Sequence, residues 1–206
     1  MTHFRQIFDP GSAAFTYLLG EHGGAAVVVD PGTERTNLPL LAMLAELNLR
    51  LEYVLQTHVH DDGPNEAAAL RERTGARVVA SEAASAGADV PVRHGDAITF
   101  GGEVIHVIAT PGHTPGSLSY LWRDRVFTGD TLLIGRCGRA GLRGEDPATL
   151  YDSITQRLFV LPGETLVFPG HDRRGRTVST IAEERERNSA IAGRSRDEFI
   201  TRRTAS

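Results

Sequence analysis

The sequence predicts a layered α/β or α+β domain rich in antiparallel hairpins, and three observations lead to this class. The chain has 206 residues, a length typical of one domain. Its apolar residues make up 40% of the total, which is enough for a sizeable core and too many for a disordered chain. Short strand-like runs and helix-like segments follow one another irregularly, which differs from the βαβ alternation of a doubly wound sheet. We therefore expect a single domain over residues 1–206.

Each expected element follows from a local signal. Apolar, Val-rich runs bounded by Gly, Pro or Asp predict strands, and apolar residues spaced three or four apart predict helices. The expected strands lie at 15–19, 25–29, 52–56, 77–80, 97–100, 103–109, 117–122, 126–128 and 166–168. The expected helices lie at 37–49, 64–73, 146–161 and 177–189, with a last short helix near residue 196.

Turn and cap residues place several boundaries. Gly23-Gly24 and Gly101-Gly102 separate paired runs, which predicts two hairpins. Pro64 suits the first turn of a helix, and Asp146 is the expected N-cap of the next one. The polar segment 193–206 is expected to be a mobile tail.

Composition excludes several classes of function. The formal net charge is -4, whereas a non-specific nucleic-acid binder needs a basic face. A single cysteine, Cys137, excludes an internal disulfide and a Cys-rich metal site. The first residues lack an apolar signal region, and no apolar run approaches the roughly 20 residues of a membrane span. We therefore expect a cytoplasmic protein with neither nucleic-acid nor membrane partners.

Four segments share one design, in which a short apolar strand ends and His or Asp follows at once in a turn. They are residues 57–62 (Thr-His-Val-His-Asp-Asp), 110–116 (Thr-Pro-Gly-His-Thr-Pro-Gly), 127–130 (Phe-Thr-Gly-Asp) and 168–172 (Phe-Pro-Gly-His-Asp). Each alone is typical of an ordinary turn. Together they predict a metal site, because strands that stop at a common edge hold ligands rigidly. Imidazole and carboxylate ligands favour Zn, Fe or Mn over Ca or Mg.

In this order the four segments resemble the metallo-β-lactamase superfamily. Residues 15–19, 131–139, 175–180 and 183–185 further resemble the persulfide dioxygenase (sulfur dioxygenase) branch. The stretch Leu-Leu-Ile-Gly-Arg-Cys-Gly-Arg within 131–139 separates this branch from its relatives. The resemblance spans residues 4 to 200 and implies a four-layered αββα sandwich with the metal at one edge.

The resemblance also implies the ligand set. One Fe(II) per chain is expected on His58, His113 and Asp130, two imidazoles and a carboxylate that leave open positions for substrates. Three further residues are expected to hydrogen-bond the ligands, with direct ligation as the alternative. They are His60, Asp62 and His171.

Position 63 bears on the number of metal ions. The superfamily's two-metal hydrolases carry a second-metal histidine where this chain has Gly63, and glycine has no side chain to offer. This departure counts against the alternative activity, a glyoxalase II-like hydrolase of a thioester or lactone. A third alternative is a non-catalytic or sulfur-transfer binding module, because the positions that hold the thiol carrier in relatives are altered here.

The implied reaction oxidises a low-molecular-weight persulfide, commonly glutathione persulfide, with O2 to sulfite and free thiol. Arg173 stands where glutathione-using relatives carry Tyr, and Arg139 is retained. Because Arg pairs with carboxylates and phosphates, we expect both to bind an acidic carrier, either glutathione or another thiol such as coenzyme A. The alternative is a solvated arginine loop. Cys137 is expected to be a small buried residue beside the site, with a persulfide-carrying role as the alternative. Family habit suggests a homodimer.

Overall fold

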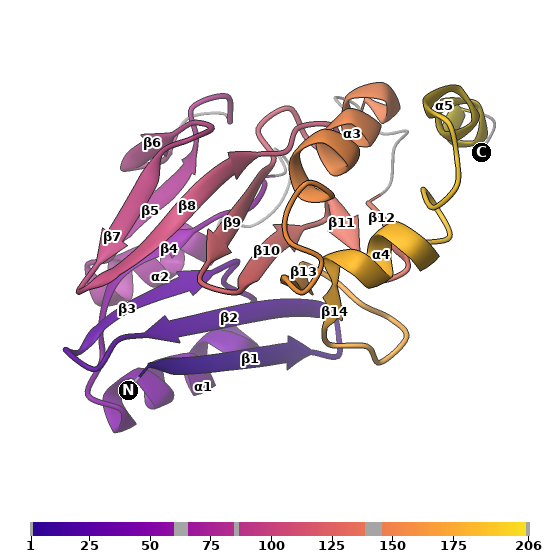
Figure 1. The fold of residues 1–206 in the computed structure, drawn as a ribbon. Helices are drawn as coiled ribbons and strands as arrows, with labels where there is room; N and C mark the ends of the chain where they lie inside the picture. Colours follow the sequence, from indigo (N-terminus) through magenta and orange to yellow (C-terminus); the bar gives the residue numbers. More distant parts are fainter. Residues whose placement is uncertain (1, 60–65, 85–86, 139–145, 205–206) are drawn as a thin grey trace.

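The computed structural model describes residues 2–59, 66–84, 87–138 and 146–204. Two six-stranded sheets face each other, and helices cover their outer faces (Figure 1). The predicted αββα sandwich is therefore confirmed. In spatial order the first sheet contains β1 (His3–Asp9), β2 (Ala14–Gly20), β3 (Ala25–Val29), β4 (Arg50–Leu55), β5 (Arg77–Ser81) and β6 (Val90–Val92).

The second sheet is assembled from the C-terminal half of the chain. Its spatial order is β14 (Ser179–Thr180), β13 (Leu166–Pro169), β10 (Arg125–Gly129), β9 (Leu118–Trp122), β8 (Glu103–Ala109) and β7 (Ala97–Phe100). A separate small hairpin pairs β11 (Leu132–Leu133) with β12 (Arg136–Cys137). The helical segments are α1 (Glu34–Glu46), α2 (Glu66–Thr74), α3 (Pro147–Ser153), the π-helical turn η1 (Ile154–Leu158), α4 (Ile181–Arg187) and α5 (Arg196–Thr204).

Strand β3 shows how the four layers are built. Val27 and Val29 face the core between the sheets, whereas Ala26 and Val28 face helices α1 and α2. Because successive side chains of a strand point to opposite faces, a strand covered on both sides is apolar throughout. The aromatic residues Tyr17, Tyr120, Trp122 and Phe127 fill the space between the sheets, and this shared core supports the proposal of one domain.

Pairing directions decide which strand ends meet. Strands β3, β4, β5 and β6 run parallel to one another, and so do β10 and β13. The remaining pairs, including both hairpins predicted from paired glycines, are antiparallel. The carboxyl ends of parallel strands lie at one edge of a sheet, which is where ligand sites form in such folds.

Of the following three segments, two differ from the sequence predictions. Strand β1 was not expected, because its sequence is mostly polar; it is a half-buried edge strand that pairs along its full length with β2. The helix expected at 177–189 is shorter, since β14 occupies 179–180 and the Thr180 side chain caps α4 by accepting from the Glu183 N–H. The helix near residue 196 is present as α5, and its Phe199 is buried against Tyr151. Mobility of the remaining tail stays a prediction.

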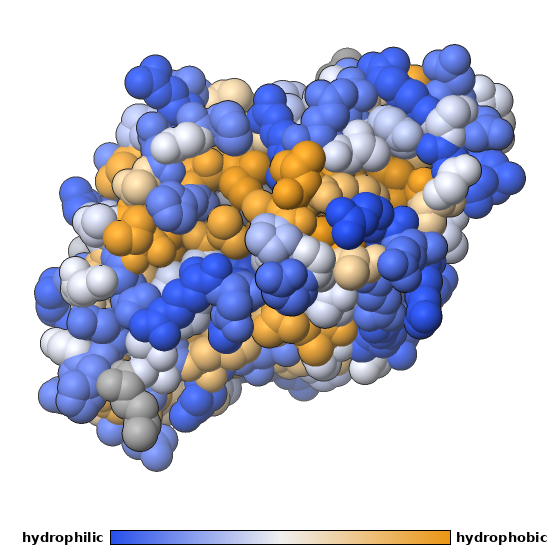
Figure 2. All heavy atoms as spheres, in the orientation of Figure 1, coloured by the Kyte–Doolittle hydropathy of each residue, from blue (hydrophilic) through white to orange (hydrophobic). Residues whose placement is uncertain are grey.

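The molecular surface seen in Figure 2 is polar at its margins, with apolar side chains gathered over the region where β8 and β9 run. Val104 on β8 is one of the exposed large apolar residues. Within the described ranges, no helix combines the length and apolarity needed to cross a lipid bilayer.

Candidate metal centre

Four strand ends converge at one edge of the sandwich. His58 follows β4, Asp130 follows β10 and His171 follows β13, while His113 lies in the loop between β8 and β9. The two sheets are joined at this edge by backbone hydrogen bonds. The Leu118 N–H donates to the Thr57 carbonyl at 2.7 Å. The sequence expectation that these turns share an edge therefore matches the arrangement of the strands.

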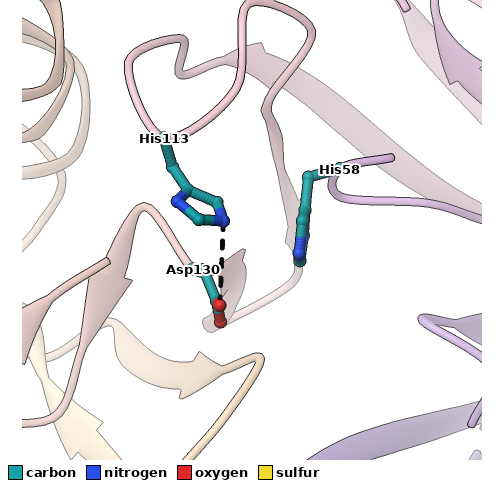
Figure 3. A group of neighbouring side chains, drawn as sticks. All are labelled: His58, His113 and Asp130. Carbon is teal, nitrogen blue, oxygen red and sulfur yellow. Dashed lines mark ion pairs between the residues drawn. The ribbon is translucent and has the colours of Figure 1, made fainter. Parts of the chain in front are cut away.

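His58, His113 and Asp130 point toward one another (Figure 3). Each offers a ligand atom, and these atoms all lie within 4.8 Å of one another. Nε2 of His113 is 3.8 Å from Oδ2 of Asp130, and the two imidazole centroids are 5.1 Å apart. Metal–ligand bonds of about 2.1 Å separate neighbouring ligand atoms by about 3 Å, so small side-chain rotations complete the set. The donor set fits a metal that leaves positions open, such as non-haem iron.

Asp130 is held in its ionised form. Burial opposes ionisation, but the hydrogen bond from His171 and the nearby imidazoles outweigh it and keep the pKa of Asp130 well below its usual range. His171 donates from Nδ1 to Oδ1 of Asp130 at 2.7 Å, and this bond in turn raises the pKa of His171. Oδ2 is the oxygen that faces His113. The hydrogen bond from His171 thus fixes the orientation of the Asp130 carboxylate.

A chain of hydrogen bonds orients His58. Asp30 accepts from the Thr57 N–H with Oδ1 at 2.8 Å and from the Thr57 hydroxyl with Oδ2 at 2.7 Å. Nδ1 of His58 is 2.9 Å from that hydroxyl oxygen. Since the single hydroxyl proton goes to the carboxylate, Nδ1 must carry the proton that it shares with Thr57. Nε2 is left with its lone pair, which is the form that binds a metal.

Asp30 has an unusual environment for a carboxylate. Burial raises its pKa to about 6, although both hydrogen bonds from Thr57 act in the opposite direction. The sequence predictions did not include Asp30 as a site residue. The signal that identifies it is the same as for Asp130, a carboxylate directly after a buried strand.

Glycines let the backbone close around Asp130. Gly129 has φ +51, and a Cβ there would lie 2.3 Å from Oγ1 of Thr57. A Cβ on Gly170 would lie 2.7 Å from Oδ1 of Asp130, in the space that the His171 hydrogen bond uses. Any larger residue at these positions would displace the candidate ligand or the side chain that orients it.

The other predicted residues are distributed as follows. Arg173 is exposed in the loop after His171, and buried Asp172 fixes that loop by accepting from the Arg174 and Arg176 N–H groups at 2.7 and 2.9 Å. Cys137 is buried, burial raises its pKa to about 11, and Nη2 of Arg203 lies 2.6 Å from its Sγ. Three predicted residues lie outside the described part of the chain: His60, Asp62 and Arg139.

Comparison with known proteins places the chain in a family. The metallo-beta-lactamase superfamily model matches residues 9–171. The human mitochondrial persulfide dioxygenase ETHE1 is 40% identical over 200 residues, which is 95% of this chain and 78% of that protein. The crystal structure of ETHE1 from Myxococcus xanthus has 51% sequence identity and a TM-score of 0.92, covering 97% of this chain and 88% of that one.

A hydrolase branch is also similar. Hydroxyacylglutathione hydrolase from Anaeromyxobacter dehalogenans is 37% identical over 171 residues, which is 81% of this chain and 65% of that protein. Its match is shorter and its identity lower than those of the persulfide dioxygenases. The chain therefore belongs to the metallo-beta-lactamase superfamily and, within it, to the persulfide dioxygenase branch.

Proposed function

We propose that this chain is an Fe(II)-dependent dioxygenase that oxidises a low-molecular-weight persulfide. In the balanced reaction, a persulfide anion R–S–S⁻, O2 and water give R–SH and hydrogen sulfite. Both oxygen atoms of O2 pass to the outer sulfur, which is oxidised, and the S–S bond breaks when water supplies the remaining oxygen and the thiol proton. The observation that carries the proposal is the grouping of His58, His113 and Asp130 on one face.

These three residues would hold one Fe(II) per chain. Bound there, iron supplies the redox chemistry that couples O2 to the sulfur, and two imidazoles with one carboxylate leave room for both reactants. The protein's own contribution is orientation. Thr57 keeps the proton of His58 on Nδ1, and His171 keeps Asp130 ionised with one oxygen facing the cluster. His60 and Asp62 are proposed to hydrogen-bond the ligands, as the sequence predicts.

The thiol carrier is proposed to be acidic. The charge of Arg173 acts against the rise in the pKa of His171, so an anionic group bound by Arg173 would lie beside the cluster. The turn fixed by Asp172 presents Arg173 to solvent, while the neighbouring Arg176 is paired with Glu183. Arg139 is the second proposed contact. Glutathione, with two carboxylates, satisfies this chemistry, and coenzyme A is the alternative carrier.

Metal analysis and oxygen uptake test the proposal together. Protein purified anaerobically is loaded with Fe(II), and glutathione persulfide is added in an oxygen electrode. We expect one iron per chain, one O2 consumed per persulfide and the appearance of sulfite. Asp130→Ala serves as the matched control without a complete ligand set.

The outcomes separate the alternatives. Two zinc ions per chain with thioester cleavage and no O2 uptake would instead assign the hydrolase activity of the hydroxyacylglutathione hydrolase relatives. If the correctly folded, iron-loaded chain turns over neither the persulfide nor a thioester, the result would favour the non-catalytic binding module. Gly63 supports the one-metal reading, since glycine adds no ligand for a second ion.

Cellular location and assembly remain proposals from the sequence. We propose a cytoplasmic protein, whereas the human relative ETHE1 is a mitochondrial protein. A homodimer is likewise proposed, with persulfide and O2 as the small-molecule partners.

A further inference from the structure

The loop that carries His113 is held from behind by the helical segment α3–η1. Three donors of this segment reach three carbonyls of the loop or of the strand end before it. The Asp146 N–H donates to the Gly112 carbonyl at 2.8 Å, and the Ser153 hydroxyl donates to the Pro111 carbonyl at 2.7 Å. The Arg157 guanidinium donates to the Ala109 carbonyl.

The helix and the loop are in direct backbone contact. Gly112 has φ +129, and a Cβ there would lie 2.4 Å from both the N and the Cα of Leu150. Leu150 itself is completely buried in the core beneath α3. The position of the loop is therefore coupled to the position of the helix, without an intervening side chain that could adjust.

Ser153 and Arg157 share one side of this segment because they are four residues apart. The π-turn begins between them, where the Phe159 N–H donates to the Ile154 carbonyl at 2.9 Å. Such turns interrupt a helix at a cost and are frequent at functional sites. Here the turn ends one residue past Arg157, whose side chain reaches back to the end of strand β8.

The loop's own hydrogen bonds do not fix it against the rest of the site. The Gly112 N–H donates to the Thr114 carbonyl at 3.1 Å and the Ser117 N–H donates to it at 3.3 Å, which sets the shape of the loop. Other described elements hold residues 109–112 by hydrogen bonds from outside the β-sheet. The Thr131 hydroxyl donates to the Thr110 carbonyl at 3.0 Å, and the other such bonds come from α3–η1. Together with the bond from Thr131, these anchors hold the loop that carries His113 relative to Asp130.

We propose that Ser153 and Arg157 are positioning residues for His113, and that they set the metal affinity of the site without touching the metal. The inference rests on the proposed function of His58, His113 and Asp130 as a metal centre. Metal sites require ligands placed within about 0.5 Å, so a loop that relaxes after losing an anchor binds the ion less tightly.

The test measures metal affinity in matched variants. Ser153→Ala removes one donor, and Arg157→Gln replaces the guanidinium by a neutral amide on a shorter side chain. Arg157→Lys keeps a cationic donor, and Thr155→Val is the control. The Thr155 hydroxyl lies on the same segment but donates at 2.8 Å to the Tyr151 carbonyl of its own helix. The dissociation constant of Co²⁺ is measured by competition with a chelator, and the melting temperature of the metal-free protein is measured in parallel.

We expect Ser153→Ala and Arg157→Gln to raise the Co²⁺ dissociation constant about 10- to 100-fold, the range typical of residues that support ligands. Arg157→Lys should recover part of the affinity, and Thr155→Val should bind as the wild type does. The visible Co²⁺ spectrum should shift in the two weakened variants because the coordination geometry changes. If Ser153→Ala does not fold, Arg157→Gln and Arg157→Lys carry the same comparison.

Wild-type affinity and an unchanged Co²⁺ spectrum in both variants, with lower melting temperatures, would assign these residues to helix packing alone and overturn the inference. A wild-type chain that binds no metal would instead overturn the proposed metal centre first, and the inference with it. Equal weakening in Thr155→Val would also contradict the proposal, because that variant leaves the loop's anchors intact.

Discussion

Replacing Asp30 by Asn is expected to weaken metal binding although it removes no candidate ligand. In the wild type, Asp30 accepts from both the N–H and the hydroxyl of Thr57, which leaves Nδ1 of His58 as the donor to that hydroxyl. In the variant, the Asn carbonyl keeps the bond from the Thr57 N–H, so the amide NH2 faces the hydroxyl. The hydroxyl must then donate its proton to Nδ1 of His58, and the imidazole proton moves to Nε2.

The magnitude follows from the bond that is lost. A hydrogen bond to a charged group contributes about 1.5 to 3 kcal/mol, and binding a metal through Nε2 requires the favoured tautomer to be restored at that cost. At about 1.4 kcal/mol per tenfold change, we expect the metal dissociation constant to rise by roughly one to two orders of magnitude. Thr57→Val should have a comparable effect, whereas Thr57→Ser keeps the hydroxyl and should bind as the wild type does.

Two measurements check this reasoning. Chelator competition gives the dissociation constant, and the ¹⁵N resonances of His58 in the metal-free protein report which ring nitrogen carries the proton. Glu103→Gln is the control, since Glu103 accepts from Trp122 at the far end of β8 from the His113 loop. An Asp30→Asn protein with unchanged affinity, or with the proton still on Nδ1, would refute the tautomer argument.

Asp130→Ala should lose the metal, whereas His171→Ala should keep most of it; equal loss in metal analysis would mean that His171 is itself a ligand. Burial raises the pKa of Asp30 from 3.8 to about 6, so the folded state holds the proton more tightly than the unfolded state. As the pH rises from below 4 to above 6, the unfolding free energy of the metal-free wild type should therefore fall by up to about 3 kcal/mol relative to that of Asp30→Asn, and a constant difference in urea titrations contradicts this. Burial raises the pKa of Cys137 to about 11, so thiol reagents should label it slowly at pH 8. The Arg203 guanidinium beside Sγ lowers this pKa, so Arg203→Ala should slow labelling further, and faster labelling would show that Arg203 acts instead by shielding the thiol.

The sequence predicted that three candidate ligands lie together, because they belong to short segments at strand ends. His58, His113 and Asp130 each follow an apolar run or a Pro-Gly turn, and rigid strands bring such positions to one edge. The two hairpins with paired glycines were equally readable, since a Gly-Gly turn between apolar runs has few other outcomes. At the strand ends and in these two hairpins, the local sequence pattern agrees with the fold.

Strand β1 and helix α4 show where local patterns fail. The β1 sequence His-Phe-Arg-Gln-Ile-Phe-Asp has too few apolar residues to predict a strand, and its stability comes from pairing with β2 and from Phe4, which packs against the core. For α4, the sequence reads as helical from residue 177, but pairing of β14 with β13 takes up 179–180 first. Pairing with distant strands decides whether β1 forms and where α4 begins. Local sequence patterns do not reveal such pairing.

The residues that hold the candidate ligands were hardest to predict, and the reason is chemical. Thr57, Ser153 and Arg157 are common residues whose roles depend on a backbone carbonyl or a carboxylate far away in sequence. His58, Asp130 and His113 are each held from a different side: by Thr57 with Asp30, by His171, and by α3–η1 respectively. Within the described residues these supports come from different side chains, so each ligand's placement can be perturbed by its own substitution. The affinity for a metal then depends on contacts that belong to no sequence motif. This explains why the sequence predicts which residues are candidate ligands but not how accurately they are placed.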